Sequence, residues 1–384
     1  MFLIVPLVLT LFYQIQSSLI VFAPPLLAPD AHIEIGVDAA SVGIITSLIY
    51  LTSVLSAYFA GRLLTKISPK SLSHFCILLS SIGILIMSIP NPYIICLGAL
   101  IIGLGYGPIT PASSAILNEI TPDRIRALIF SIKQSGVPIG GAVAGILVPG
   151  IILISNWKAT IFLISFLGLV LISISFFINF KVEKNTNLDK KTNFKSPIIY
   201  VLQDKKLREL GFSSFTYSGM QMCLGSYLVL TLIQKYDFNL EKAGYFLSVA
   251  MIAGIVARPM AGIISDKISN ARLVLAYMGI VMSLCSGLIF FIGDLNIFFL
   301  TIFCAIFGAS AVGWNGVYLS EVARIAENKM VGAATGACLS MTYLGVVVLP
   351  IIFFLSYIVF RKYEISFLLL SIITLTRAIL FLKR

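Results

Sequence analysis

Long apolar runs, separated by short polar segments, fill the chain from end to end. A helix needs about 20 apolar residues to cross the hydrocarbon core of a membrane, and the chain offers twelve runs of that kind. The first six are expected at 2–26, 38–63, 71–89, 93–117, 127–153 and 157–180. The second six are expected at 209–234, 241–264, 272–292, 295–320, 329–356 and 364–382.

The runs do not alternate as strands of a barrel would, and lipid offers a backbone amide no partner outside its own helix. We therefore predict an all-α membrane protein with 12 transmembrane helices in two pseudo-symmetric six-helix bundles. Composition agrees, since 59% of the residues are hydrophobic and 11% are charged, against about 25% charged in soluble domains.

A repeat supports the division into two bundles. The segment from Gly43 aligns without a gap with the segment from Gly244, 201 positions later, so that Gly61 matches Gly262 and Lys66 matches Lys267. Such a repeat is typical of membrane proteins built from two similar halves. We expect an N-terminal bundle at 1–180, a linker at 181–208 and a C-terminal bundle at 209–384.

The basic residues predict the orientation. A net charge of +11 could indicate nucleic acid, but the basic residues lie in short loops, so we expect no nucleic-acid partner and interpret them as topology signals. With the linker inside the cell, all but five of the 27 Lys and Arg residues lie on the inner side. The five outer residues are Lys158, Lys235, Lys242, Arg361 and Lys362. Both termini are then cytoplasmic, in a plasma membrane (bacterial inner membrane).

No catalytic constellation is visible in the sequence. The two histidines, His32 and His74, lie near loops, and no nucleophile triad or metal-ligand spacing accompanies them. The glycines of Gly103-Leu-Gly105-Tyr-Gly107 lie inside an apolar helix with no strand before them, so a nucleotide loop is rejected. The six cysteines lie in or beside apolar runs and are interpreted as packing residues. We expect no enzyme activity, no metal and no cofactor.

Two cations lie inside apolar runs. Lys133 in span five and Arg258 in span eight are each roughly 10 Å, at 1.5 Å per residue, from an inner helix end. A buried cation is costly and usually faces a cavity or a partner. The alternatives are snorkelling to the surface or pairing with an acid at a helix end. Because no Asp or Glu lies deep in a span, an anion is the favoured partner.

Amides, hydroxyls and aromatic rings gather on spans one, four, seven, ten and eleven. Such groups suit a small, partly polar ligand, although hydrogen bonding between helices is an equal alternative for any one of them. The candidate substrate-binding residues are Lys133, Gln134, Arg258, Gln14, Tyr106, Tyr217, Gln221, Trp314, Asn315, Tyr318 and Tyr343.

The turn from Gly262 through Asp266 and Lys267 to Arg272 resembles the loop signature of the major facilitator superfamily. That signature lies between the second and third helices of each half. The first-half copy keeps Gly61 and Lys66 but has Thr65 in place of the acid. The resemblance implies two bundles around a cavity that opens alternately to each side. The candidate gating residues are Gly61, Lys66, Gly262, Asp266, Lys267, Arg272, Glu119 and Glu321.

The resemblance also implies two contacts. Asp266 is expected to face the start of span eleven, near 329–332, and to accept hydrogen bonds from backbone amides there. Spans five and eight lie close together in the family's fold, so Lys133 and Arg258 are expected to converge on one anion.

Three functions remain open. The first is a secondary transporter of a small organic anion, foremost a carboxylate, similar to oxalate/formate antiporters and cyanate or nitrate permeases, although no substrate motif is matched. The second is a proton-driven drug or metabolite efflux antiporter, because Gly136-Val-Pro138-Ile-Gly140-Gly141 resembles the antiporter signature of span five with altered spacing. The third is a non-transporting receptor or scaffold. The expected partners are a small-molecule substrate and the lipid bilayer, and the family implies a monomer.

Overall fold

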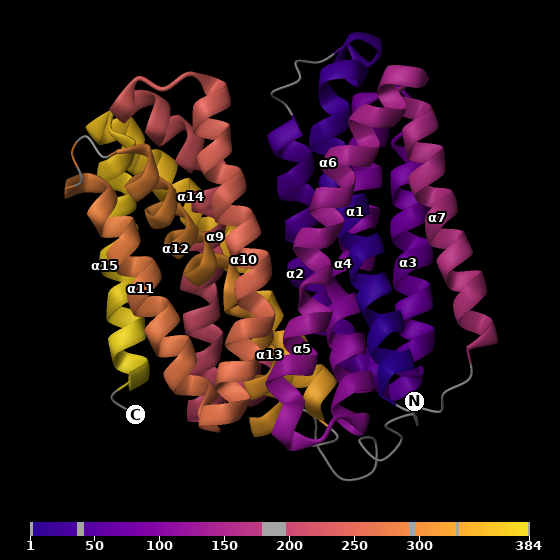
Figure 1. Cartoon of the computed structure of the whole chain (residues 1–384). Coiled ribbons are helices and arrows are strands. Elements are labelled where there is room, and N and C mark those ends of the chain that lie inside the picture. The colour runs from indigo at the N-terminus through magenta and orange to yellow at the C-terminus, as the bar shows by residue number, and fades with distance from the viewer. Residues whose placement is uncertain are drawn as a thin grey trace. The chain divides into compact units, whose positions relative to one another are not determined.

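The computed structural model describes residues 3–36, 42–178, 197–291, 293, 296–327 and 330–382, and these residues form helices joined by short turns (Figure 1). The first half of the chain forms α1 (Ile4–Ile35), α2 (Val42–Lys66), α3 (Pro69–Ile86), α4 (Pro92–Ile120), η2 (Asp123–Ile125), α5 (Arg126–Gln134), α6 (Gly136–Ile154) and α7 (Trp157–Phe177). The second half forms α8 (Pro197–Gln203), α9 (Lys205–Tyr236), α10 (Leu240–Ile268), α11 (Ala271–Phe291), α12 (Ile297–Gly313), α13 (Asn315–Ile325), α14 (Val331–Phe360) and α15 (Tyr363–Leu382).

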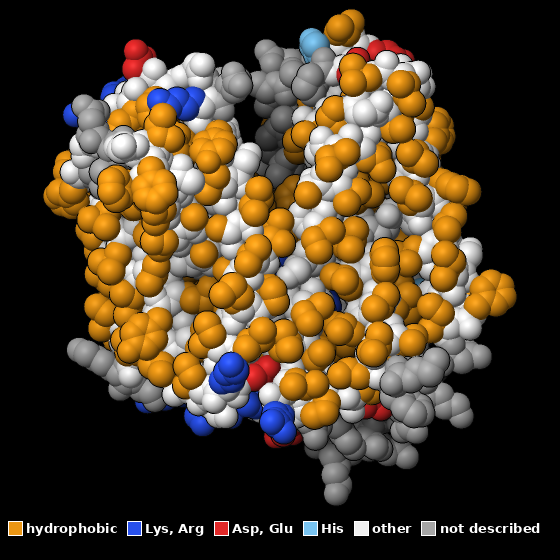
Figure 2. Space-filling model, viewed as in Figure 1, with side chains coloured by type: hydrophobic (Ala, Val, Ile, Leu, Met, Phe, Trp, Pro, Cys, Tyr) orange, Lys and Arg blue, Asp and Glu red, His pale blue; other side chains and the backbone are white. Residues whose placement is uncertain are grey.

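Eleven segments of the described chain are long and apolar enough to cross a membrane. The remaining long helix is α9, which contains the expected span 209–234 and has the length but a more polar sequence. Apolar side chains cover the visible sides of the helices, and Lys and Arg gather toward the helix ends (Figure 2). Phe162 and Ile252 are among the exposed apolar residues. The protein is therefore a multi-pass membrane protein.

Local sequence explains where several helices begin. Asn91 and Ser68 precede helices that start with proline, and their side chains accept hydrogen bonds from the first free amides of α4 and α3. Asn156 caps α7 in the same way. Small polar caps followed by proline are the usual start of a helix, because proline lacks an amide that would otherwise need a partner. At the other end of a helix, α1 continues past the expected residue 26 and ends where Gly36 adopts a left-handed φ of 75°.

Two compact units form, and each takes a segment from the other half of the sequence. Unit 1 comprises Met1–Thr121, Lys133–Gln203 and Ile325–Ser340, and unit 2 comprises Pro122–Ile132, Asp204–Arg324 and Met341–Arg384. The expected boundaries 1–180, 181–208 and 209–384 follow the chain and stay a prediction. Residues 181–196 of the expected linker lie outside the described residues, and the linker's end forms α8 and the start of α9.

In unit 1, glycines bring helices into backbone contact. A Cβ atom on Gly103 would lie 2.1 Å from the carbonyl oxygen of Ile49 on α2, and one on Gly105 would lie 2.6 Å from that of Cys76 on α3. Small residues at helix interfaces let backbones approach closely in membranes. The glycine run of α4 is therefore a packing surface, with α2 on one side and α3 on the other.

In unit 2, α10 packs on α12, and α11 packs on α15. A Cβ atom on Gly308 of α12 would lie 2.0 Å from the carbonyl oxygen of Ala250 on α10. Ser283 and Ser286 of α11 donate hydrogen bonds to carbonyl oxygens of α15, at 2.6 and 2.7 Å. Small residues and serine hydroxyls thus hold the helices of this unit together, as expected where lipid removes the hydrophobic driving force between helices.

Candidate functional site

A single turn residue interrupts each of expected spans five and ten. Ser135 separates α5 from α6, and Trp314 separates α12 from α13. An interruption leaves carbonyl and amide groups without partners in their own helix, so side chains nearby can supply them. Asp123–Ile154 and Ile297–Ile325 are nevertheless each a single segment long and apolar enough to cross a membrane, as predicted for spans five and ten, and Ser135 and Trp314 keep helical backbone angles.

The first cation lies at the interruption of span five, in unit 1. Lys133 is fully buried in the last turn of α5, and its Nζ donates a hydrogen bond to Oε1 of Gln134 at 3.1 Å. Gly136 begins α6 and packs against the side chain of Gln14 on α1. Gln14 is also buried, and its Oε1 accepts a hydrogen bond from Thr110 of α4 at 2.9 Å. The interruption therefore gathers one cation and two amide side chains from helices expected to line the cavity.

The second cation lies at the interruption of span ten, in unit 2. Arg258 of α10 is 1% exposed, and its Nε donates to the carbonyl oxygen of Val312 at 3.0 Å. Val312 lies in the last turn of α12, where carbonyl groups lack helical partners and attract a positive charge. The interruption thus explains how an arginine is accommodated inside an apolar helix bundle.

Aromatic and amide side chains surround this second interruption. The Trp314 ring contacts Tyr217 edge-on, with centroids 5.7 Å apart, and tilts against Tyr318 at 5.3 Å. Asn315 donates to Oε1 of Gln221 at 3.1 Å and so joins α13 to α9. Five of the predicted residues therefore gather from α9 and the α12–α13 junction around the helix ends that hold Arg258.

Two predicted residues serve packing in the structure. Tyr106 of α4 contacts Tyr50 of α2 edge-to-face, with centroids 6.3 Å apart. Tyr217 donates a hydrogen bond from its hydroxyl to the carbonyl oxygen of Leu275 on α11 at 3.1 Å, so this hydroxyl already has an acceptor within the bundle.

Tyr343 is buried on α14, beside the point where the carbonyl of Thr342 accepts a hydrogen bond from Ser218 of α9. The convergence of Lys133 and Arg258 stays a prediction, since the two residues belong to different units.

Asp266 contacts a helix other than the expected one. Its two carboxylate oxygens accept hydrogen bonds from the amides of Ala127 and Leu128, at 3.0 and 2.9 Å. These amides lie in the first turn of α5, at the start of span five, so the prediction of span eleven is wrong. The predicted chemistry is the observed one, because free amides at a helix N-terminus attract a carboxylate. The expected partner Lys329 lies outside the described residues.

The glycines of the two repeated turns explain this difference. A Cβ atom on Gly262 would lie 2.8 Å from Cα of Leu128, so only glycine lets α10 approach α5 here. In the first half, a Cβ atom on Gly61 would lie 2.7 Å from Cα of Ala333, at the start of α14. Each copy of the turn therefore packs on the helix that begins in the opposite half of the sequence. Thr65, in the acid's position, donates a hydrogen bond to the carbonyl oxygen of Arg62 on its own helix.

The other gating candidates divide into buried and exposed residues. Glu321 is 1% exposed, and Arg324 grips its carboxylate with two hydrogen bonds of 2.7 Å. Glu119, the other acid among the gating candidates near a helix end, is exposed near the end of α4. Lys66 and Lys267 lie in the last turns of α2 and α10, where a cation complements the helix dipole.

Sequence reasoning missed one buried acid and one arginine. Arg272 pairs with Glu209 of α9 at 3.1 Å, and Arg377 of α15 donates to the carbonyl oxygen of Glu209 at 3.5 Å. Glu209 is 8% exposed, although it lies at the edge of an apolar run where exposure was expected. Its burial could not be predicted from the sequence, because it accompanies the ion pair with Arg272 of α11, which is distant in the chain.

Glu34 and Lys158 join the end of α1 to the start of α7. Glu34 accepts hydrogen bonds from Lys158 and from the indole of Trp157. The hydrogen bond from Lys158 holds the pKa of Glu34 below its ordinary value. Lys158 was predicted on the outer side of the membrane, and its contact with Glu34 brings the end of α1 and the start of α7 to one common side.

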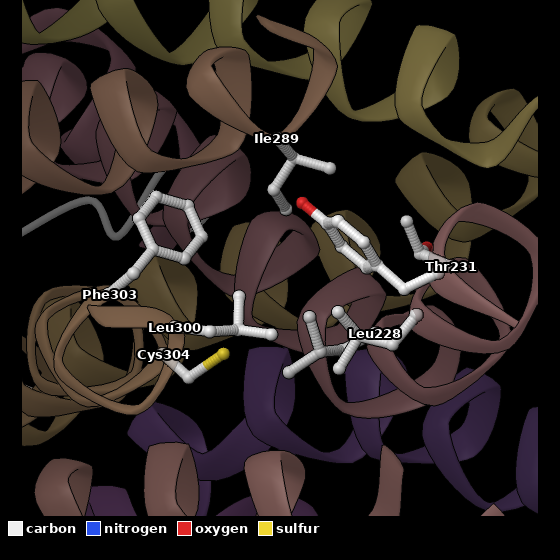
Figure 3. Close-up of a pocket in the computed structure, with 8 residues that line it drawn as sticks. Leu228, Thr231, Ile289, Leu300, Phe303 and Cys304 are labelled. Carbon is white, nitrogen blue, oxygen red and sulfur yellow. The ribbon is translucent and has the colours of Figure 1, made fainter. Parts of the chain in front are cut away.

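A small cavity lies between α9, α11 and α12 (Figure 3). Leu228, Thr231, Ile289, Leu300, Phe303 and Cys304 line it. Its volume of about 10 Å³ is close to what a single water molecule needs. The cavity is therefore too small for an organic substrate.

Comparisons with known proteins agree with the architecture. The model of the Major Facilitator Superfamily matches residues 7–382. The hexuronate transporter of Bacillus subtilis is 23% identical over 176 residues, which are 44% of this chain and 42% of that protein. The benzoate transport protein of Acinetobacter baylyi is 21% identical over 358 residues, which are 83% of this chain and 76% of that protein.

A solved structure shows the same fold. The fucose:proton symporter of E. coli matches with a TM-score of 0.79 and 15% identity, over 100% of this chain and 99% of that one. The family model covers almost the whole sequence, including both interrupted spans and both repeated turns. The chain belongs to the major facilitator superfamily, whose members are membrane transporters and not enzymes.

Proposed function

We propose that this protein is a secondary active transporter of a small organic anion, foremost a carboxylate, and that it works by alternating access. The observation that carries the proposal is the burial of two charged side chains, one within interrupted span five and one beside interrupted span ten. Lys133 is 0% exposed and Arg258 is 1% exposed. Cations inside membrane helices are costly, rare and usually functional, so their presence favours a substrate of opposite charge.

The surroundings of the two cations suit a carboxylate. An arginine can hold a carboxylate through two parallel hydrogen bonds, whereas a lysine acts as a point charge. The neutral oxygens of Gln134 and Val312 orient the two cations. Around Arg258, the Trp314 and Tyr318 rings add apolar surface and Asn315 adds an amide. A cation with rings and amides can bind a small anion that carries an apolar or hydroxylated body.

Two relatives support the substrate class. Hexuronate and benzoate, named for the two related transporters, are both carboxylates. Their bodies differ, one being a sugar and the other an aromatic ring. The shared feature is the carboxylate group, which is the feature that Arg258 would recognise.

The two repeated turns supply the proposed gate. Asp266 and Gly262 hold the start of α5 against α10, and Gly61 holds the start of α14 against α2. Each contact joins helices from opposite halves of the sequence. We infer that these contacts close the cytoplasmic side of a bacterial inner membrane and separate when the cavity opens there.

The alternative of a drug efflux antiporter has less support. It depended on the glycines that follow Gly136 in span five. A Cβ atom on Gly136 would lie 3.0 Å from the carbonyl oxygen of Leu11, and one on Gly140 would lie 2.5 Å from that of Ile15. Both glycines thus pack α6 on α1, and packing accounts for them.

Ligand-induced stabilisation of the purified protein tests the proposal. A ligand that binds only the folded state stabilises it by about 2.7 kcal/mol at a hundred times its Kd. We expect glucuronate, benzoate, oxalate or formate to raise the melting temperature, and cationic drugs to leave it unchanged. Arg258→Lys should weaken the response by about ten- to a hundredfold in Kd, because a charged hydrogen bond is worth about 1.5–3 kcal/mol.

Lys133→Gln should also weaken the response by removing a charge, whereas Lys242→Gln is the control. Lys242 lies over the Phe238 ring at the start of α10, away from both interruptions. Stabilisation by cationic drugs alone, or an anion response that both Lys133→Gln and Arg258→Lys retain, would contradict the proposal.

A further inference from the structure

A long apolar groove runs along unit 2 between α10, α11 and α12. Its volume is about 720 Å³, against about 10 Å³ for the cavity of Figure 3. Its lining extends along α10 from Ala253 to Ile268, which is about 22 Å at 1.5 Å per residue. Apart from Tyr277 and Ser310, the described residues that line it are apolar, and the hydroxyl of Ser310 donates to carbonyl oxygens of its own helix. The groove therefore suits a long apolar ligand.

The depth of the groove comes from alanines that lie between longer side chains. Ala261 of α10 is buried, and it lines the groove together with Ala309 of α12. Met260, Tyr277 and Ile306 also line it and are each roughly half exposed. Half the hydrocarbon core of a membrane is about 15 Å thick, which is less than the length of the groove. One acyl chain of one leaflet therefore fits along it.

One end of the groove meets the charged turn between α10 and α11. Ile268 and Leu273 line that end, one on each side of the turn. Lys267 is exposed in the last turn of α10, seven residues after Met260 and therefore on nearly the same side of the helix. Both carboxylate oxygens of Asp266 accept hydrogen bonds from amides of α5, on another side of α10. The charge at this end of the groove is therefore positive, and Figure 2 shows Lys and Arg at the lower ends of α10 and α11.

The start of α11 adds to the attraction for an anion. Asn270 caps this helix, and its Oδ1 accepts a hydrogen bond from the amide of Leu273 at 3.0 Å. The N-terminus of a helix carries a partial positive charge and binds anions such as phosphate. A cation and a helix start thus lie together where a long apolar groove ends. This combination matches a molecule with an apolar chain and an anionic head.

We propose that the groove between α10, α11 and α12 holds one acyl chain of an anionic phospholipid, and that Lys267 and the start of α11 bind its phosphate. The site lies within unit 2 and needs no substrate, so it goes beyond the proposed transport function. Basic residues near a membrane surface attract anionic lipids. A zwitterionic lipid has the same chains, but its own cation lies near Lys267 and weakens the attraction.

The groove also lies behind the end of α12. A Cβ atom on Gly313 would lie 2.8 Å from Cε of Met278 and 3.0 Å from Cβ of Ala257, and both of these residues line the groove. Gly313 follows Val312, whose carbonyl oxygen accepts the hydrogen bond from Arg258. A chain bound in the groove therefore supports the side chains behind this helix end, and we expect bound lipid to raise the melting temperature.

Native mass spectrometry of the purified protein tests the charged end. Phosphatidylglycerol and phosphatidylcholine with the same two oleoyl chains are added separately, and we expect phosphatidylglycerol to bind more tightly. Lys267→Gln should weaken its binding by about fivefold, the effect of one basic residue near an anionic headgroup. Lys66→Gln is the matched control, because Lys66 has the same position in the first repeated turn and lies on α2 of unit 1, which does not line the groove.

Equal binding of the two lipids, or an equal loss in Lys66→Gln, would overturn the headgroup site. A melting temperature raised as much by inorganic phosphate as by phosphatidylglycerol would show that no chain is needed, and would also overturn the proposal.

Photo-crosslinking tests the groove without any substitution in its lining. Phosphatidylglycerol with a diazirine in one chain is added in trace amounts to the protein in nanodiscs. We expect it to label Met260, Tyr277 or Ile306, and unlabelled phosphatidylglycerol should suppress this labelling more than unlabelled phosphatidylcholine does. Phe162, an exposed apolar residue of α7, is the control, and its labelling should not depend on which lipid surrounds the protein. Groove labelling that is equally indifferent to the lipid, or crosslinks that join two copies of the chain through the groove, would contradict a bound anionic lipid.

Discussion

Arg258 occupies a membrane helix because span ten ends and restarts beside it. Carbonyl oxygens in the last turn of a helix lack amide partners in that helix and carry the negative end of its dipole, so they are favourable acceptors for a cation. The end of α12 leaves the carbonyl of Val312 available, and Nε of Arg258 takes it at 3.0 Å. The sequence identified Arg258 and Lys133 by their charge alone. The acceptor of Arg258 could not be predicted, because the end of α12 was not visible in an unbroken apolar run.

Asp266 provides a prediction for a single residue. Its two oxygens accept hydrogen bonds from two amides, and an asparagine would place a donor against one of them. Asp266→Asn should therefore weaken the contact between α10 and α5 by about 0.5–2 kcal/mol, the range of a lost helix cap. We expect normal membrane insertion and a slower uptake of the substrate found in the binding screen.

Asp123→Asn is the control for Asp266. Asp123 is an acid near the same helix start, its side chain is 85% exposed, and it pairs with Arg126 one turn later. Exposed pairs of this kind contribute little to stability. Uptake at the unmodified rate in Asp266→Asn would remove this contact from the gate.

Helices α10 and α12 show how elements of this protein are held together. Gly308 of α12 lies against the backbone of Ala250, and Gly254 of α10 lies against the side chain of Val312, so each helix has a glycine that makes room for the other. The glycine content of the runs was visible in the sequence. The sequence did not reveal which glycine meets which neighbour, because that depends on the rotation of each helix about its own axis.

A matched pair of glycine substitutions tests this packing. Gly308→Ala would put a Cβ atom 2.0 Å from the backbone oxygen of Ala250, which cannot move aside without shifting α10. Overpacking of this kind costs about 1–3 kcal/mol. Gly150→Ala, in α6, meets nothing within 4 Å, and alanine favours a helix by about 0.8–1.0 kcal/mol over glycine.

The measurement is the melting temperature of each purified variant in the same detergent. We expect Gly308→Ala to melt below the unmodified protein and Gly150→Ala to melt at or above it. Equal melting temperatures for the two variants would show that the close approach at Gly308 is relieved by a small movement of the helices.

The whole molecule divides into two compact units that do not follow the two halves of the sequence. Segment 122–132 packs with unit 2 and segment 325–340 packs with unit 1. The sequence repeat predicted two halves and gave no sign of this exchange. It arises because each repeated turn has a glycine that fits the first turn of a helix from the other half.

The orientation in the membrane is a prediction for the whole molecule. Both termini and the segment 181–208 should lie in the cytoplasm, because basic residues concentrate on that side of membrane proteins. An impermeant thiol reagent, added from outside to intact cells, should label a cysteine at position 32 and miss one at position 187. The native cysteines are buried or partly buried, and the unmodified protein measures their background. Labelling at 187 but not at 32 would reverse the inner and outer sides assigned above.

The sequence by itself determined the class of the protein. Runs of apolar residues long enough for a membrane, two similar stretches 201 positions apart and one charged turn were sufficient for a multi-pass helical membrane protein and for the superfamily. These features can be recognised in the sequence because lipid requires each spanning segment to form its backbone hydrogen bonds within itself. The two buried cations were also visible in the sequence, because a charged residue differs clearly from the apolar residues around it.

Only the tertiary structure decided the contacts. It placed Asp266 against α5, joined Glu209 to Arg272, and linked His74 through Ser175 to Tyr13. Each of these contacts joins helices that are far apart in the sequence, and each depends on where a helix is interrupted or how it is rotated. Such choices follow from the fit of side chains between helices, and the hydropathy of a single helix does not contain that information.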